Sequence, residues 1–385
     1  MYPAMQALLK LLTIVCLALL PAALAGCGGD SGVLPQSADP NRTDNAPQAS
    51  ARKDANVYAA THAGMLAAAA RGVPYRLYVP NSESDTVDVI DPERKEIVSS
   101  FSVGGLPQHV TPAPDMRTLY VNSNQGNSLR RVDPRTARPT GEPIPVEDPY
   151  NLYFTLDGKT AIVMAERLAR LDFRDAKTMK LQKSVEVPCK GLNHLDFSAD
   201  GRTFVASCEF DSALIEVDTR RRKVVGRRSL PRMGMPQDVK LSPDGKLFYV
   251  ADMQADGVWI VSADDFRIKR LLRTGNGAHG LYPSRDAHLL FVSNREEGSI
   301  TVIDFATGRI KRKWRLPGGG SPDMGGVSPD GKRLWLSGRY NSEVYGIDTH
   351  TGKLRARIPV GNGPHGMAVW PQPGRYSIGH TGNTR

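Results

Sequence analysis

The fold of this chain is decided by the tetrapeptide Phe-Val-Ser-Asn at 291–294 and the alternating run Ile-Thr-Val-Ile-Asp at 300–304. Short strands of the type aromatic-Val-x-Asn/Ser recur from residue 78 onward, at intervals of 42 to 45 residues. The copies begin at Tyr78, Tyr120, Ile162, Phe204, Tyr249, Phe291 and Trp335. A period of this length is typical of β-propeller blades.

Each copy is followed by a second strand pattern and is separated from the next copy by a tight turn. The second patterns alternate apolar residues with period 2, which is typical of strands, and end at Asp91, Asp133, Asp172, Asp218, Asp304 and Asp348, but at Ser262 in the fifth copy. We expect these Asp residues to cap the turn that follows. Pro-Asp-Gly at 243–245 and 329–331 and Asp-Gly at 157–158 and 200–201 are tight-turn signals, because Gly supplies the positive φ. Each repeat thus predicts four strands, a (before the turn), b, c and d, which is one blade.

The number of repeats predicts a closed ring. Seven b strands are present, but the first has no a strand before it, since the compact sequence begins almost directly at Tyr75. A matching a strand, Gly-Pro-His-Gly-Met-Ala-Val-Trp, lies at 363–370 near the other end of the chain. We therefore expect an all-β, seven-bladed propeller of four-stranded antiparallel blades, in which the C-terminal strand completes the first blade and removes an open edge.

These repeats resemble those of the YVTN-type β-propeller family. The resemblance rests on Tyr-Val-Pro-Asn at 78–81, Phe-Val-Ser-Asn at 291–294, Val-Ile-Asp at 302–304 and Gly-Asn-Gly-Pro-His-Gly at 361–366, and it covers roughly residues 74–372. It implies an exported or surface protein whose superfamily includes the haem d1 propeller of nitrite reductase. Some family members bind single-stranded DNA, so the resemblance defines the architecture more closely than the chemistry.

The start of the chain predicts export and a lipid anchor. Residues 1–26 contain an uncharged apolar run and end in Leu-Ala-Gly, and Cys27 follows, which resembles the lipobox of bacterial lipoproteins. The alternative is an ordinary signal peptide with an unmodified cysteine. Residues 27–73 are expected to form a flexible tether with one short helix within 57–71, and residues 74–385 the propeller. Gly28 after the cysteine favours the outer over the inner membrane, facing the periplasm or the surface.

Two cysteines remain in the expected propeller. Cys189 lies in the connection before the fourth blade, and Cys208 follows the b strand of that blade. Both should emerge on the same face, and an exported protein meets an oxidising compartment, so we expect a disulfide. Two independent buried thiols are the alternative.

Two adjacent columns of polar residues are expected where the a strands begin, at the mouth of the central channel. This mouth belongs to the face formed by the d-to-a and b-to-c connections, which we call the connection face. The columns supply ten candidate ligand-binding residues: Gln108, His109, Asn151, Asn193, His194, Gln237, Asp238, His279, Asp323 and His365.

The histidines in these columns are candidate metal ligands. His109, His194, His279 and His365 come from four blades, and imidazoles with carboxylates suit a transition metal, a haem or an anionic small molecule. The alternative is a polar lining that bonds backbone groups and channel water. The sequence requires no cofactor, and neither metal nor haem is specified by a ligand motif.

Basic residues concentrate on the expected d strands of neighbouring blades. The chain carries a formal net charge of +10. The expected basic rim comprises Arg221, Arg222, Lys223, Arg270, Lys311, Arg312 and Lys313. Charged edge strands resist edge-to-edge pairing, whereas a functional rim would attract nucleic acid or an anionic envelope polymer.

We therefore expect a binding or scaffold module of the bacterial envelope that acts through its connection face. Its expected partners are the membrane, through the lipid anchor, and an envelope protein or small-molecule ligand, and we expect a monomer. A metal- or haem-dependent redox or hydrolytic enzyme at the histidine-rich mouth is one alternative, and polyanion binding, nucleic acid included, by the rim is another. The sequence contains no Gly-x-Ser-x-Gly elbow and no His-Glu-x-x-His motif, and no catalytic residue can be assigned.

Overall fold

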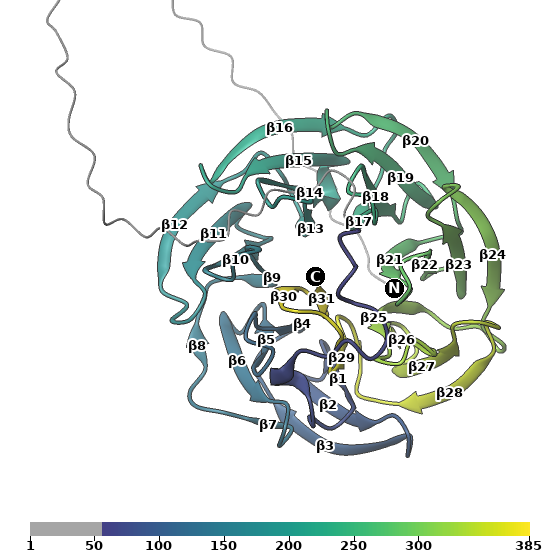
Figure 1. The fold of residues 1–385 in the computed structure, drawn as a ribbon. Helices are drawn as coiled ribbons and strands as arrows, with labels where there is room; N and C mark the ends of the chain where they lie inside the picture. The colour runs from purple at the N-terminus through teal and green to yellow at the C-terminus, as the bar shows by residue number, and fades with distance from the viewer. Residues whose placement is uncertain (1–55) are drawn as a thin grey trace, which may run out of the picture. The chain divides into compact units, whose positions relative to one another are not determined.

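The computed structural model describes residues 56–385, which form seven antiparallel sheets arranged as blades around a central channel (Figure 1). In each blade strand a lies next to the channel and strand d forms the outer rim. The predicted seven-bladed propeller is therefore confirmed. Among these residues, no helix has the length and apolar character needed to cross a bilayer.

The strands follow the repeats in order. Blade 1 contains β29 (Ala368–Trp370), β1 (Arg76–Asn81), β2 (Thr86–Asp91) and β3 (Glu96–Ser102). Blade 2 contains β4 (Pro107–Pro112), β5 (Leu119–Ser123), β6 (Ser128–Asp133) and an interrupted outer strand, β7 (Arg138–Pro139) and β8 (Ile144–Pro145). Blade 3 contains β9 (Pro149–Phe154), β10 (Thr160–Ala165), β11 (Arg170–Asp175) and β12 (Leu181–Glu186). Blade 4 contains β13 (Leu192–Phe197), β14 (Thr203–Cys208), β15 (Ala213–Asp218) and β16 (Lys223–Ser229).

The remaining blades have the same order. Blade 5 contains β17 (Pro236–Leu241), β18 (Leu247–Asp252), β19 (Gly257–Ser262) and β20 (Ile268–Arg273). Blade 6 contains β21 (Ala278–Pro283), β22 (Leu289–Asn294), β23 (Ser299–Asp304) and β24 (Arg309–Arg315). Blade 7 contains β25 (Pro322–Val327), β26 (Arg333–Gly338), β27 (Glu343–Asp348) and β28 (Leu354–Pro359). Two short strands, β30 (Ser377–Gly379) and β31 (Asn383–Thr384), and two 3-10 turns, η1 (Ala68–Ala70) and η2 (Glu209–Asp211), complete the chain.

The turns have the chemistry that the sequence predicts. Asp304, at the end of strand c in blade 6, accepts a hydrogen bond from the Thr307 backbone N–H at 3.0 Å. In the a-to-b turn of blade 5, Asp244 accepts one from the Ser242 hydroxyl at 2.6 Å, and Gly245 has a φ of 73°. Asp therefore bonds backbone or hydroxyl groups that the turn leaves free, while Gly adopts the left-handed conformation.

The ring closes as predicted, through a strand from the end of the chain. β29 pairs antiparallel with β1, with Leu77 opposite Val369. Blade 1 therefore contains segments from both ends of the propeller sequence, and its inner edge is paired.

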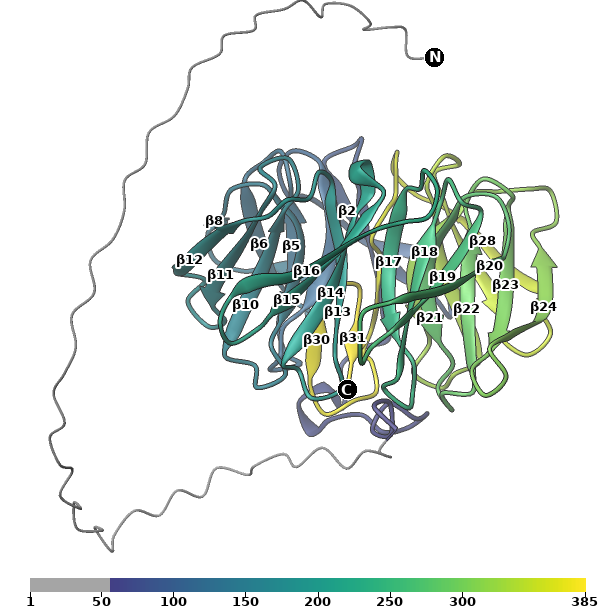
Figure 2. The same cartoon turned by 90° about the horizontal axis from the view of Figure 1, so that it is seen from above.

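Residues 56–73, which the sequence assigns to the tether, pack against the face formed by the a-to-b turns, here called the turn face (Figure 2). The Val57 N–H donates to the Pro243 carbonyl in the blade 5 turn at 2.8 Å, and the buried Tyr58 hydroxyl donates to the Leu241 carbonyl at 2.7 Å. The helix expected within 57–71 is reduced to the three-residue turn η1. The Val57 backbone N–H and the Tyr58 hydroxyl thus find partners on the propeller, so the segment does not need helical hydrogen bonds there.

The last residues of the chain enter the central channel from the turn face, a feature that the sequence analysis did not predict (Figures 1 and 2). β30 joins the inner edge of blade 3, with Gly379 opposite Tyr153, and β31 pairs with β30. Ile378 is fully buried there. We call residues 375–385 the plug segment.

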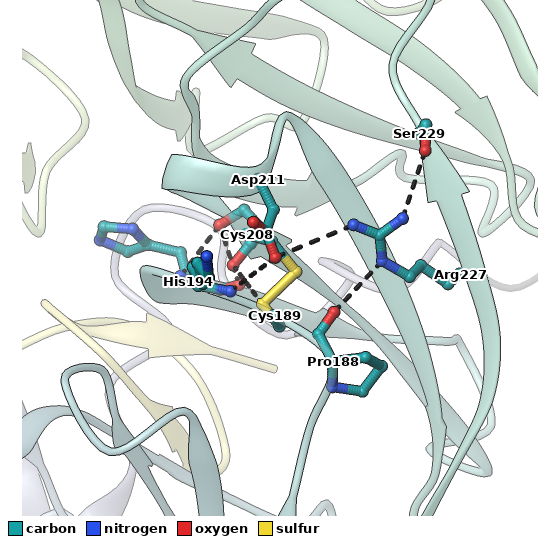
Figure 3. The surroundings of a disulfide bond; sticks show 9 residues. Pro188, Cys189, His194, Cys208, Asp211, Arg227 and Ser229 are labelled. Carbon is teal, nitrogen blue, oxygen red and sulfur yellow. Dashed lines mark hydrogen bonds and ion pairs between the residues drawn. A yellow bond between two sulfur atoms is a disulfide. The ribbon is translucent and has the colours of Figure 1, made fainter. Parts of the chain in front are cut away.

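The predicted disulfide is present. Cys189 and Cys208 are joined by an S–S bond of 2.10 Å in blade 4 (Figure 3). Arg227 of the outer strand β16 lies beside it and donates to the Pro188 carbonyl at 3.2 Å. The disulfide therefore fastens the connection that leads into β13 to the end of β14, next to His194, which is on the channel side.

Candidate functional site in the central channel

The two polar columns are the two residues of a β-bulge near the start of the inner strands. In β13, Asn193 and His194 lie opposite the single residue Ser207 of β14, and the same two-against-one step occurs in β17, β21 and β25. A bulge changes the direction of side chains, so two successive residues of one strand can both face the channel. The Ser207 hydroxyl accepts the His194 N–H at 3.1 Å, which satisfies a backbone group that the bulge removes from the ladder.

The structure corrects the expected position of these residues: they are buried inside the channel and do not form an open, water-lined mouth. Relative exposure is at most 7% for Gln108, His109, Asn151, Asn193, His194, Gln237, Asp238, His279, Asp323 and His365. The plug segment contacts the columns from the turn face through His380, and Glu209 and Arg295 contact Asn193 and Asp323 from the connection face. The columns lie around the channel axis, as the repeat register predicts, whereas the plug segment lies outside the repeats.

Five histidine rings meet in the channel. His109 lies 5.3 Å from His194 and 5.0 Å from His365, measured between ring centroids. The fifth ring, His380, comes from the plug segment and lies 4.7 Å from His194 and 5.2 Å from His109. His380 was missed because it lies outside the repeats. Burial lowers the pKa of His109, His194 and His380 well below its ordinary value, so these imidazoles are neutral at pH 7.

His279 and His365 belong to a separate group centred on Asp323. Their Nδ1 atoms lie 3.0 and 2.7 Å from the two carboxylate oxygens of Asp323. Arg295 Nη1 lies 3.2 Å from the same carboxylate. Burial alone would raise the pKa of Asp323, but His279, His365 and Arg295 together hold it well below its usual range. The four histidines predicted as one metal set are therefore divided between two environments.

The other candidates form contacts with one another and with the backbone. The Asn193 amide donates to Glu209 at 2.6 Å and to Gln237 at 3.1 Å. Asp238 accepts the Leu281 N–H at 3.0 Å, and burial raises its pKa to about 6 although Lys240 lowers it. The Asn151 side-chain amide lies 3.3 Å from His380 Nδ1. Gln108 is buried, like the other candidates.

A third column, missed in the sequence analysis, lies on the connection face where each b strand ends. Its members are the residues directly after β1, β5, β10, β14, β18, β22 and β26: Ser82, Asn124, Glu166, Glu209, Met253, Arg295 and Arg339. Aligning the ends of the b strands would have found it. Acids occupy two neighbouring blades, and arginines occupy two others. Burial, together with Glu209 and Asp148, raises the pKa of Glu166 to about 8, and burial also raises the pKa of Glu209.

The connection face also exposes large apolar side chains. Four of them lie in its loops: Leu168, Phe210, Met233 and Tyr340, with 45%, 62%, 76% and 64% of their surface exposed. Arg295 lies over the Tyr340 ring at 5.3 Å from its centroid. Apolar groups of this size beside charged groups are typical of surfaces that bind other molecules.

The basic rim lies on neighbouring outer strands, as the sequence predicts. Lys223 begins β16, Arg221 and Arg222 lie in the turn just before it, Arg270 is on β20, and Lys311, Arg312 and Lys313 are on β24. Several of these side chains link blades: Arg270 donates to the Gly308 carbonyl at 2.6 Å, and Arg312 to the His350 carbonyl at 2.9 Å. Lys313 pairs with Glu297 at 3.1 Å within its own blade. Part of the positive charge thus has a structural role.

Comparison with known proteins agrees with this architecture. The model of the YNCE-like beta-propeller family matches residues 52–373. Antigen Lp49 of Leptospira interrogans is 26% identical over 226 residues, which cover 53% of this chain and 48% of the antigen, so the alignment spans about half of that relative. The uncharacterized protein YncE of Salmonella typhi is 22% identical over 289 residues, covering 69% of this chain and 80% of YncE.

Solved structures share the fold at low sequence identity. Hydrazine synthase of Kuenenia stuttgartiensis superposes with a TM-score of 0.60 at 19% identity, covering 71% of this chain and 92% of that chain. The dihydro-heme d1 dehydrogenase NirN superposes with a TM-score of 0.59 at 16% identity, covering 77% of this chain and 75% of that chain. Because the family model extends over almost the whole propeller, the chain belongs to the YNCE-like β-propeller family.

Proposed function

We propose that this chain is an envelope-anchored binding module that docks a partner protein on its connection face. The observation that carries the proposal is the exposed apolar set of that face, Leu168, Phe210, Met233 and Tyr340. The turn face has less free surface for a partner, because residues 56–73 pack across it and the plug segment enters the channel through it. Ligand access therefore favours the connection face.

Charge indicates what the partner presents. Glu166 and Glu209 lie on adjacent blades, and burial together with the negative charge of Glu209 raises the pKa of Glu166 to about 8. A lysine or arginine of a partner would relieve this repulsion on binding. We therefore propose a protein surface that combines apolar side chains with a basic group. Aromatic anchors such as Phe210 and Tyr340 commonly supply most of the binding energy at such interfaces.

The docking proposal predicts that the triple variant Phe210→Ser, Met233→Ser, Tyr340→Ser loses the partner. The matched control replaces three exposed apolar residues of the outer strands, Leu181, Val225 and Ile310, with serine; they are 45%, 49% and 39% exposed. After cross-linking in the native envelope, the wild type and the control should capture the same protein. Loss of an anchor residue typically costs 1–4 kcal/mol, so the connection-face variant should bind at least about tenfold more weakly.

Three results would contradict this proposal. The first is capture of the same partner by all three proteins, and the second is equal loss of the partner in both triple variants. The third is capture of nothing by the wild type. Circular dichroism and thermal unfolding of each variant establish that the propeller remains folded.

The channel histidines favour a binding module over an enzyme. His109, His194 and His380 are essentially without solvent exposure, beneath the charged third column, so a substrate would not reach them in this conformation. The plug segment occupies the space beside these rings that a haem of the kind named for NirN would need, since the His380 ring lies 4.7 and 5.2 Å from the rings of His194 and His109. The rim, with arginines bound to neighbouring blades, supports polyanion binding less than the connection face supports docking.

We also propose that Cys27 anchors the protein to the membrane; this residue lies outside the described residues. Cys27→Ser is expected to move the protein from the membrane fraction to the soluble envelope fraction and to abolish labelling with an alkyne fatty acid. Cys16→Ser, within the expected signal, is the matched control and should stay membrane-bound. If the Cys27→Ser variant stays in the membrane fraction and is still labelled, the proposal that Cys27 is the lipid anchor is wrong.

A further inference from the structure

Three buried histidines form a cluster whose ligand atoms all lie within 4.8 Å of one another: His109, His194 and His380. They come from three separate parts of the chain, namely β4 of blade 2, β13 of blade 4 and the plug segment between β30 and β31. All three are essentially without solvent exposure. Three imidazoles at this separation are the donor set that transition metals such as Zn²⁺ bind.

Several ring nitrogens of this cluster have no hydrogen-bond partner among residues 56–385. They are His109 Nε2, both nitrogens of His194, and His380 Nε2. A buried polar atom without a partner costs about 1–3 kcal/mol, so four such atoms in one place require an explanation. A shared metal ion would satisfy one nitrogen of each ring.

The surroundings of the cluster favour a bound cation. His109 Nδ1 lies 2.9 Å from the Tyr150 carbonyl, so Nδ1 carries the proton and Nε2 presents its lone pair toward the cluster. Such backbone contacts commonly orient metal-binding histidines. Asp238 Oδ1 lies 3.7 Å from His380 Nε2 and supplies a nearby negative charge.

We propose that His109, His194 and His380 bind a divalent transition-metal ion, of which Zn²⁺ is the type, and that this ion fastens the plug segment inside the channel. The ion would join blade 2, blade 4 and the plug segment at one point. The site is structural, since it is closed to substrate, and it is independent of the proposed docking function. His279 and His365 are not part of it, because their Nδ1 atoms face Asp323.

The test uses the mature chain without a histidine tag. Metal analysis of the native protein and titration with Zn²⁺ and Co²⁺ after unfolding and refolding with a chelator should give one ion per chain. Bound Co²⁺ should show the visible absorption of a nitrogen-coordinated site. His194→Gln and His380→Gln should weaken binding at least about 100-fold, whereas His288→Gln, an exposed histidine in a turn of blade 6, should bind as the wild type does.

The fastening of the plug segment has its own readout. Hydrogen exchange of residues 375–385 should slow on metal addition in the wild type and in His288→Gln, but not in His380→Gln. The proposal is overturned if the native and refolded wild type bind none of these ions stoichiometrically. It is also overturned if the glutamine variants of His194 and His380 bind as tightly as the wild type. Should either variant fail to fold, metal content and exchange of the wild type alone decide the matter.

Discussion

Replacing Asp323 with asparagine is expected to lower the free energy of unfolding by about 3–5 kcal/mol, because it leaves a buried guanidinium without its counter-charge. Asp323 is fully buried and Arg295, 11% exposed, lies 3.2 Å from it. The same carboxylate is hydrogen-bonded to His365 Nδ1 at 2.7 Å, and His279 Nδ1 lies 3.0 Å from it. Denaturant unfolding of the wild type and Asp323→Asn at pH 7 measures the difference.

The pH dependence of this difference follows from the direction of the Asp323 pKa shift. Its pKa in the folded state lies below the unfolded value of about 3.9, so the folded state binds fewer protons and the stabilisation is present above that value. The gap between wild type and variant should therefore stay constant from pH 5 to 8 and narrow as the pH falls below about 4. Asp286→Asn, in an exposed turn, is the control and should cost less than about 1 kcal/mol. If Asp323→Asn lowers the free energy of unfolding no more than Asp286→Asn does, the ion pair between Asp323 and Arg295 does not stabilise the fold.

The fold was predictable because each blade repeats the same local signals. A strand, a tight turn and a capping Asp recur at a fixed interval, and each signal depends only on neighbouring residues. Even the closure of blade 1 by residues 368–370 followed from counting, since one inner strand was missing at one end and present at the other. The disulfide was predictable for the same reason, as the repeat register placed both cysteines on one face.

The site was predictable only in the part that shares this period. The two columns were predictable because the inner strands of blades 2 to 7 carry a bulge at the same place near their start. His380 did not appear, because the plug segment has no counterpart in other blades and its partners are distant in sequence. Burial of the columns depends on that same segment and on the contacts of Glu209 and Arg295 from the connection face, so the expected open mouth is wrong. The third column could have been predicted by aligning the ends of the b strands, but its members differ in chemistry from blade to blade and form no visible pattern.

Deleting the plug segment, residues 375–385, is expected to lower the free energy of unfolding by at least about 5 kcal/mol. Ile378 is fully buried, and loss of a buried aliphatic side chain of this size costs about 2–5 kcal/mol. Arg385 donates to the buried Asp196 at 2.8 Å and lies over the Tyr58 ring at 4.8 Å from its centroid. Breaking that buried pair costs about 3–5 kcal/mol more.

A single substitution separates the two contributions. Arg385→Ala should lose only the ion-pair part of the effect, because Ile378 and the pairing of β30 with β9 remain. The unfolding free energies of the wild type, Arg385→Ala and the deletion should therefore decrease in that order, measured with a chelator present so that metal adds nothing. If the deletion were as stable as the wild type, water would be filling the channel at no cost. The polar columns would then be the solvated lining that the sequence allowed as an alternative.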